Sequence, residues 1–414
     1  MPIQRPCDVI LYGATGFVGR QSALYFAAHA PGVRWAIAGR SVTKLESLRA
    51  ELAAARPALV VADAGDAAAL DALAAQTRVV LSTAGPFARY GSELVAACVR
   101  HGTHYVDITG ETPWVRQLID RHHAAAAKSG TRIVPGCGFD SVPSDLGAWL
   151  VASALMQQHG ERCASVKACF SIRGGLNGGT AASMLNALDE GVQGQVDEPF
   201  LLNPTGTAPA DAASHRDPAG AVRDADFDAW LAPFVMGPIN TRVVRRSAAL
   251  LADSGPYAPD FRYQEYARMG RGASGALAAT ALAVGMAAGR SAMALAPLRR
   301  IAARFLPAPG QGPSERAMDS GSFRCELIGV GERGSVQRGC IAGRGDPGNR
   351  ATTVFVCESA LALALDAKRL PGAARLGGVL TPAVALGEVL AARLHAAGMT
   401  IEPYADHAAP RRAP

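Results

Sequence analysis

The stretch VILYGATGFVGR, residues 9–20, decides the fold of the N-terminal part of the chain. Residues 9–13 predict a buried strand, and the sequence Gly13-Ala-Thr-Gly16-Phe-Val-Gly19 opens a helix directly after it. In such a loop the first glycine permits a tight turn, the second lets a pyrophosphate approach the backbone, and the third lets the helix pack closely on the strand. The helix start offers free N–H groups and a positive dipole end to phosphates. The loop therefore predicts a dinucleotide-binding site, the alternative being a tight turn without a ligand. The residues expected to contact the dinucleotide here are Gly13, Thr15, Gly16, Phe17, Val18 and Gly19.

Outward from this loop, short apolar runs alternate with helical stretches as far as residue 135. The predicted strands are 9–13, 35–38, 59–62, 79–82, 104–108 and 132–135, and the predicted helices are 19–30, 44–55, 67–75, 92–100 and 113–128. This alternation is typical of right-handed βαβ units and a parallel sheet. The strands are apolar throughout, which indicates burial on both faces. The predicted fold class is α/β, with an N-terminal Rossmann-type parallel sheet.

The pattern changes after about residue 145. A helix over 146–158, a strand over 165–172, a helix opening at Thr180 and strand-like runs at 322–330 and 352–357 predict a second sheet with helices. We therefore predict a dinucleotide-binding domain over 1–145 and an α+β domain over 146–380 that contains an apolar helix at 273–289. Residues 381–414 are expected to form a helix that returns to the first domain, followed by a tail.

The end of the second strand indicates which dinucleotide is bound. Enzymes that use NAD commonly carry Asp or Glu there, about 20 residues beyond the glycine loop, to bind the ribose 2′-hydroxyl. This chain has Arg40 and Ser41, with Lys44 one turn further on. A guanidinium in place of a carboxylate favours a 2′-phosphate, so we expect NADP, although a solvated arginine at a helix entry is the alternative. Asp63 at the end of the third strand is expected beside the adenine, or else as a helix cap.

Three loops follow strands at the edge where ligands bind in open α/β sheets. The small residues Thr83, Ala84 and Gly85, with Pro86, are expected to contact the cofactor. Tyr90, Glu111 and Asp140 are the candidate catalytic acids, because a hydroxyl or a buried carboxyl at a strand end can transfer a proton. A structural hydroxyl and a helix cap are the alternatives for Tyr90 and Asp140. No tyrosine is followed by lysine four residues later, so the mechanism of short-chain dehydrogenases is excluded in its usual form.

Composition excludes several other classes. The net charge is +6, but the basic residues are scattered and aromatic residues make up only 6%, so a nucleic-acid-binding protein is not expected. The eight cysteines form no Cys-x-x-Cys pair, and no metal site is predicted. No signal sequence is expected, which indicates a cytoplasmic protein. The charge-free stretch 273–289 is shorter than the roughly 20 residues of a membrane span.

Five motifs together carry a resemblance to a known family. VILYGATGFVGR (9–20), WAIAGRS (35–41), STAGPFARYG (82–91), YVDITGE (105–111) and GCGFDSVPSD (136–145) resemble the saccharopine dehydrogenase-like oxidoreductases, whose bacterial branch includes trans-acting enoyl reductases. The resemblance is dense over residues 8–150 and thinner beyond. It implies an NADP-binding Rossmann domain and a C-terminal domain that supplies the substrate cleft and self-association, here as a homodimer.

What the resemblance implies about the substrate stays open. The enoyl reductase branch reduces a carbon–carbon double bond of a lipid or polyketide-type acyl chain in an apolar site. The stretch 273–289, followed by Arg290, Arg299, Arg300 and Arg304, favours this branch and a peripheral contact with a membrane, although a buried helix or a dimer contact would also explain it. The alternatives are an imine reductase of the saccharopine type, which needs cations for substrate carboxylates, and a non-catalytic NADP-binding module associated with lipid.

Overall fold

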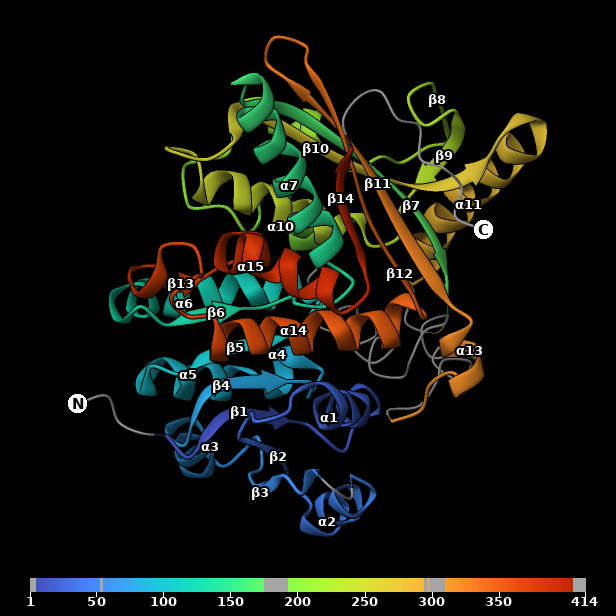
Figure 1. Ribbon diagram of the computed structural model, residues 1–414. Coiled ribbons are helices and arrows are strands. Elements are labelled where there is room, and N and C mark those ends of the chain that lie inside the picture. Colours follow the sequence, from blue (N-terminus) through green and yellow to red (C-terminus); the bar gives the residue numbers. More distant parts are fainter. Residues whose placement is uncertain (1–4, 53–54, 175–192, 294–296, 298–309, 405–414) are drawn as a thin grey trace.

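The computed structural model describes residues 5–52, 55–174, 193–293, 297 and 310–404. Within these ranges the chain forms two seven-stranded sheets, one below the other in Figure 1, with helices packed on and between them. The predicted α/β class is confirmed. The helix expected to open at Thr180 lies outside the described residues, as do Arg299, Arg300 and Arg304.

The first sheet is parallel and has the strand order β13-β6-β5-β4-β1-β2-β3. Its strands are β1 (Cys7–Tyr12), β2 (Trp35–Gly39), β3 (Ala58–Val61), β4 (Thr77–Ser82), β5 (His104–Asp107), β6 (Arg132–Val134) and β13 (Gly378–Val379). The helices between these strands are α1 (Phe17–His29), α2 (Val42–Glu51), α3 (Ala67–Ala75), α4 (Phe87–Tyr90), α5 (Ser92–His101) and α6 (Thr112–Ser129). All six predicted strands and five predicted helices are present. The strand order reverses beside β1, which places the carboxyl ends of β1 and β4 at a switch point where ligands bind.

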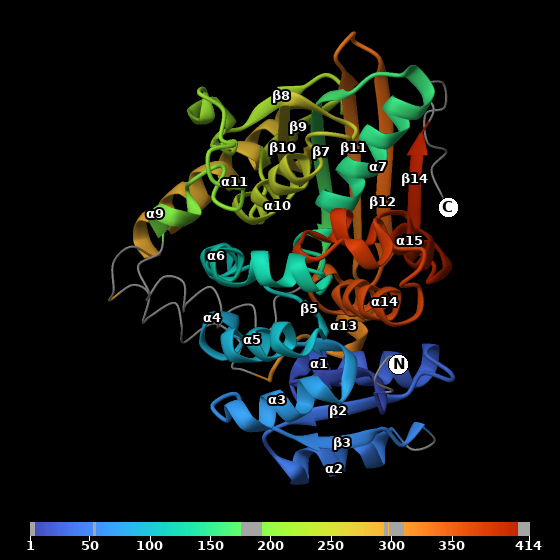
Figure 2. The same cartoon turned by 90° about the vertical axis from the view of Figure 1, so that its left-hand side faces the viewer.

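Two layers of helices bury the first sheet, as the apolar strands predicted. Helices α3, α5 and α6 cover one face, and α1 and α2 cover part of the other (Figure 2). Val9 and Leu11 point to one core, whereas Ile10 and Tyr12 point to the other. Alternate residues of one strand therefore serve both faces.

The rest of the second face is covered by α14 (Thr352–Leu365), from the last quarter of the chain. The strand predicted over 352–357 is wrong. Thr352, Thr353, Val354 and Val356 are β-branched and typical of strands, but the apolar run continues to Leu365, longer than an ordinary strand. The helix packs on β1, β4, β5 and α1 while neighbouring helices cover its other side, so nearly all of its residues are buried.

The second sheet is mixed and has the order β14-β12-β11-β7-β10-β9-β8. Its strands are β7 (Cys163–Arg173), β8 (Val222–Asp224), β9 (Ala229–Pro233), β10 (Tyr257–Gly270), β11 (Ser322–Gly331), β12 (Val336–Arg344) and β14 (Thr400–Tyr404). Only β7 and β10 pair in parallel among these strands. Helices α7 (Val142–His159) and α10 (Gly237–Leu250) cover the face toward the first domain, and α11 (Gly272–Met293) packs along β9 and β10 on the other face (Figures 1 and 2).

Short helical segments and one longer helix complete the described chain. The short segments are α9 (Gln193–Val196), η2 (Ala212–His215), α13 (Glu315–Asp319), η3 (Pro347–Ala351) and η4 (Ala373–Arg375). Helix α15 (Pro382–Ala396), close to the predicted 381–397, packs against α14 and α7 and touches β6. Segments beyond residue 145 thus complete the first sheet, through β13, and the helical layer on it, through α14. The domain limits stay a prediction.

Candidate active site

The glycine loop after β1 is packed as its sequence predicts. Gly13 has a φ of +80°, and a Cβ there would lie 2.9 Å from the backbone nitrogen of Ala84. A Cβ on Gly19 would lie 2.2 Å from the carbonyl oxygen of Gly13. Both positions therefore exclude any larger residue, because backbone atoms fill the space a side chain would need.

The start of α1 is free to bind an anion. Gly16 occupies the N-cap position, no side chain caps the helix, and no acidic residue lies in its first turn. The Phe17 ring lies against Gly312, where a Cβ would be 2.4 Å from the ring, so the segment before α13 covers the loop. Thr15 is exposed and Val18 is buried. These features fit the pyrophosphate of a dinucleotide.

The residues expected to choose the cofactor gather at the ends of β1, β2 and β3. Arg40 and Lys44 are exposed, and the Ser41 hydroxyl caps α2 by accepting a hydrogen bond from the Lys44 backbone N–H at 3.4 Å. The first turn of α2 has no acidic residue. The first turn of α2 therefore carries no negative charge that would oppose a 2′-phosphate.

Tyr12, which the sequence did not single out, joins these residues. Burial, with the nearby Asp63 carboxylate, raises the pKa of Tyr12 to about 12, while Arg40 opposes the shift. Asp63 accepts a hydrogen bond from the Gly65 N–H at 2.9 Å, whereas Asp66 caps α3, so Asp63 is not the helix cap. The helix-cap alternative for Asp63 is thus excluded, and its place beside the adenine stays a prediction.

The loop after β4 is tied to the glycine loop. The Thr83 hydroxyl donates to the Gly13 carbonyl oxygen at 3.1 Å, and Ala84 lies against Gly13. Gly85 is exposed, Pro86 precedes α4, and both are at the same edge of the sheet. This arrangement fits a loop that lies beside the ribose and nicotinamide of a bound dinucleotide.

Glu111, a candidate acid, holds a backbone terminus. Its two carboxylate oxygens accept hydrogen bonds from the backbone N–H groups of Phe87 and Ala88, each at 2.8 Å. Glu111 thus caps α4 and fixes the loop after β4 to the loop after β5. With both oxygens engaged by backbone N–H groups, the Glu111 side chain suits a structural role better than proton donation.

Asp140, the second candidate carboxyl, has a different environment. It lies before α7, and its Oδ2 is 3.8 Å from the place where a Gly110 Cβ would be. Among the described residues no hydrogen bond reaches its carboxyl group, and burial raises its pKa to about 6. It does not cap α7. A carboxyl with such a pKa is partly protonated near neutral pH and can donate a proton.

Two neighbouring aspartates, Asp107 and Asp145, instead accept hydrogen bonds that hold parts of the fold together. Asp107 accepts hydrogen bonds from the N–H groups of Thr109 and Gly136, at 3.0 and 2.9 Å, and joins the loops after β5 and β6. Asp145 accepts from the Ala383 N–H at 2.7 Å and from Ser247, which joins α7 to α15 and α10. Burial raises the pKa of each to about 7, but these hydrogen bonds use both carboxyl groups to join parts of the fold.

Tyr90, the third candidate acid, ends α4 and is half-buried. The Arg89 guanidinium lies 5.4 Å from the centre of its ring. Glu111 caps the short helix that Tyr90 ends, and Asp140 lies near Gly110, the residue before Glu111. The structure thus brings the three candidates into one region.

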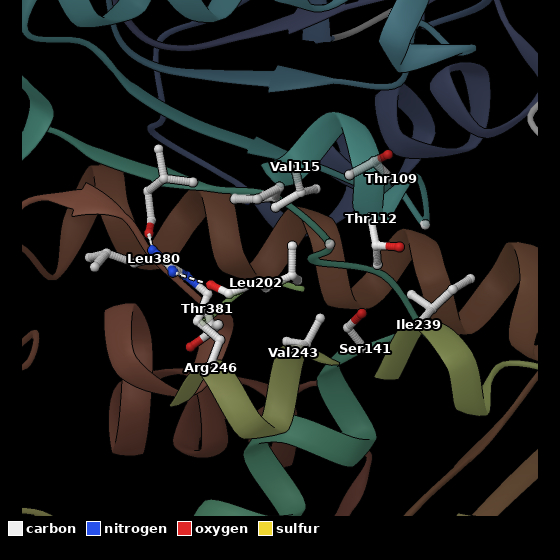
Figure 3. Close-up of a pocket in the computed structure, with 14 residues that line it drawn as sticks. Thr109, Thr112, Val115, Ser141, Leu202, Ile239, Val243, Arg246, Leu380 and Thr381 are labelled. Carbon is white, nitrogen blue, oxygen red and sulfur yellow. Dashed lines mark hydrogen bonds between the residues drawn. The ribbon is translucent and has the colours of Figure 1, made fainter. Parts of the chain in front are cut away.

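A pocket lies beside this region, between the two domains. Thr109, Thr112 and Val115 lie on one side of it, and Ile239, Val243 and Arg246 of α10 lie on the other (Figure 3). Most of the fourteen lining residues are aliphatic or glycine. Arg246 is the one cationic residue among them, and it donates to the carbonyl oxygens of Leu202 and Val379. The pocket therefore presents a mostly apolar surface.

Sequence reasoning missed the second domain's contribution. Ile239 approaches within 3.0 Å of where a Gly110 Cβ would be. The next residue, Asn240, donates to the buried Glu265 at 2.8 Å, and Ser144 and Tyr263 donate to the same carboxylate. No sequence motif predicts this hydrogen-bond network, because its residues are scattered along the chain. Within the described residues, no group of three metal-ligating side chains could hold an ion.

Comparison with known proteins agrees with these features. Residues 9–134 match the family model of the saccharopine dehydrogenase NADP-binding domain. A trans-acting enoyl reductase of Mycobacterium ulcerans (strain Agy99) is 38% identical over 98% of this chain and 99% of its own length. A relative from Mycobacterium tuberculosis (strain H37Rv), provisionally named in the same way, is 40% identical over 96% of this chain and 97% of its own.

A solved structure supports the fold over the same length. Apo saccharopine dehydrogenase (L-Glu forming) from Saccharomyces cerevisiae aligns with a TM-score of 0.50 at 14% identity, covering 96% of this chain and 99% of that one. At this identity the likeness concerns the fold alone.

Proposed function

Because the chain belongs to the saccharopine dehydrogenase-like family, in its trans-acting enoyl reductase branch, we propose that it reduces the carbon–carbon double bond of a lipid or polyketide-type acyl substrate. Membership makes the chain an NADP-dependent oxidoreductase with a small-molecule substrate. The nature of that substrate is the part we propose.

The lining of the pocket is the observation that carries the proposal. An imine of the saccharopine type brings carboxylates, which need unpaired cations to bind them. The one lining cation, Arg246, already donates to two backbone carbonyl oxygens. Arg242 and Arg245 on the same helix are likewise engaged, with Asp217 and with backbone carbonyl oxygens. The carbonyl oxygen of a neutral acyl group suits this surface better than a carboxylate does.

Asp140 is the proton donor we propose. When bound, NADPH supplies hydride to the β-carbon of the double bond. The α-carbon must then receive a proton. Asp140 has a raised pKa and no hydrogen-bond partner in the described chain. Both carboxylate oxygens of Glu111 accept hydrogen bonds from backbone N–H groups, and Tyr90 lies at the half-exposed end of α4. We assign Glu111 the role of holding the loop, not of donating the proton.

The exposed face of α11 is where we propose a peripheral membrane contact. It is the one described helix long and apolar enough to cross a membrane. Its other face packs on β9 and β10 through Gly275, Ala279 and Ala283, an arrangement that a spanning helix would have to abandon. Leu277 and Val284 are 74% and 62% exposed, which suits a surface contact. Cytoplasmic location and a homodimer remain predictions.

Native mass spectrometry of the protein purified without detergent, after addition of NADPH, tests the proposal. The expected result is a complex with NADP(H) and an acyl or polyketide-type mass, and oxidation of NADPH on addition of an enoyl thioester. A retained polar adduct with an amino-acid backbone, together with no reaction with the thioester, would contradict the proposed substrate.

A further inference from the structure

Two buried hydroxyl groups face the pocket without a partner. Thr112 begins α6 and Ser141 precedes α7, and they are 2% and 0% exposed. Neither hydroxyl oxygen has a hydrogen bond within the described part of the chain, although both residues line the same pocket. A buried polar group without a partner costs roughly 1–3 kcal/mol. We therefore expect both hydroxyl groups to form a hydrogen bond when a ligand is bound in the pocket.

The hydroxyl group of Ser141 lies where a serine ordinarily forms a hydrogen bond. It occupies the N-cap position of α7, where serine ordinarily accepts a hydrogen bond from the helix, yet its side chain makes none. Gly136, opposite, leaves room for it, because a Cβ there would lie 3.2 Å from the Ser141 Oγ. The fold thus keeps this hydroxyl free and gives it space.

The surroundings define what the pair can bind. The cavity has a volume of about 20 Å³, enough for about one oxygen-sized group. Thr112 and Ser141 lie at its Ile239 end, away from Arg246 (Figure 3). The positive ends of two long helices, α6 and α7, meet there, and they favour negative charge. Two O–H donors in this setting suit a carbonyl oxygen that gains negative charge.

We propose that Thr112 and Ser141 donate hydrogen bonds to the carbonyl oxygen of the acyl substrate and stabilise the enolate; this assignment rests on the proposed function. Hydride addition at the β-carbon shifts the π electrons of the double bond toward the carbonyl, so negative charge develops on its oxygen. The α-carbon then takes the proton of Asp140, the carbonyl re-forms, and Asp140 is left as carboxylate. In the balance, one NADPH and one proton are consumed, and a saturated acyl group and NADP⁺ are produced.

The kinetic test uses Thr112→Val and Ser141→Ala with trans-2-dodecenoyl-coenzyme A and NADPH. Removing one such donor costs on the order of 100-fold in kcat, with KM and the Kd of NADPH nearly unchanged. Thr112→Ser and Ser141→Thr keep a hydroxyl and are expected to restore most of kcat. Thr353→Val is the matched control, because Thr353 is also buried with an unpartnered hydroxyl, but on α14. Wild-type kcat in both Thr112→Val and Ser141→Ala would overturn the proposal.

A crystal structure of the NADP⁺ complex with dodecanoyl-coenzyme A provides a test without turnover. We expect the carbonyl oxygen within hydrogen-bond distance of both hydroxyls. If the wild-type protein does not oxidise NADPH with the enoyl thioester but the structure shows this geometry, the proposed reaction fails and the binding assignment stands. A carbonyl bound elsewhere, or no binding of the thioester, would contradict the assignment.

Discussion

The cofactor edge and the substrate pocket of this protein are built in opposite ways. The cofactor edge comes from the first 86 residues, its glycine loop offers backbone groups, and Thr15, Arg40 and Lys44 are exposed there. The pocket joins segments around residues 110, 140, 240 and 380, and its polar groups are buried. The difference teaches that a site made of backbone can be predicted from a local motif, whereas a site made of buried side chains depends on the whole fold.

The strongest test of this comparison is Gly19→Ala at the cofactor edge. The new Cβ would lie 2.2 Å from the Gly13 carbonyl oxygen, and backbone cannot move aside cheaply. We expect a loss of NADPH binding by at least about 100-fold and a free energy of unfolding lower by about 1–3 kcal/mol. Isothermal titration and urea unfolding measure the two effects. Gly220→Ala, with no atom near its Cβ, is the control. Unchanged binding in Gly19→Ala would show that the loop does not hold the dinucleotide.

Asp140→Asn probes the pocket side. It should lower kcat by about 100- to 1,000-fold, because a positioned acid contributes about that much, while the Kd of NADPH stays unchanged. In the wild type the acid must be protonated, so kcat should fall tenfold per pH unit above a pH of about 6, the raised pKa of Asp140. The variant should lack this slope. If the slope persists in Asp140→Asn, another group is the acid.

Arg40→Ala removes a charged side chain at the cofactor edge and leaves the backbone of the glycine loop unchanged. It therefore measures how much of NADPH binding depends on charge. A hydrogen bond to a charged group is worth roughly 1.5–3 kcal/mol, so the Kd of NADPH should rise by about 10- to 100-fold while that of NADH stays constant. Fluorescence titration with both nucleotides measures this. Arg49→Ala, at an exposed arginine on the adjoining helix α2, should change neither value. An intact preference for NADPH in Arg40→Ala would contradict the assignment of Arg40.

The smallest expected effect is on stability. Burial raises the pKa of Asp140 from 3.8 to about 6, so the folded state resists ionisation and loses stability as the pH rises from about 4 to 6. Asp140→Asn removes that loss. We expect the variant to be more stable at pH 8, by up to about 3 kcal/mol, and no different below pH 4. Urea unfolding at both pH values is the measurement, with exposed Asp253→Asn as control. A variant that is less stable at pH 8 would show that the carboxylate is stabilised by the fold.

Much of the first domain was predictable, because glycine spacing and apolar strands are local signals. The prediction failed at 352–357, where β-branched residues suggest a strand but the buried segment continues to Ala364, longer than an ordinary strand. Within the site, Asp140 and Glu111 looked alike in sequence. Their hydrogen bonds separate them, since two N–H groups hold Glu111 and none in the described chain reaches Asp140. Thr112 and Ser141 could not be recognised, because an unpartnered hydroxyl is visible only after the surrounding elements are placed.

The position of α14 has a consequence for synthesis. Ribosomes deliver the first domain long before residues 352–365, and N-terminal domains ordinarily fold as they emerge. Here the nascent domain leaves the exit tunnel with part of one face of its sheet uncovered. Helix α14, which covers that part, is synthesised only after some two hundred further residues. Because this apolar face of the sheet stays exposed during that time, we expect the nascent chain to be prone to aggregation. We expect it to depend on chaperones until its last quarter is translated.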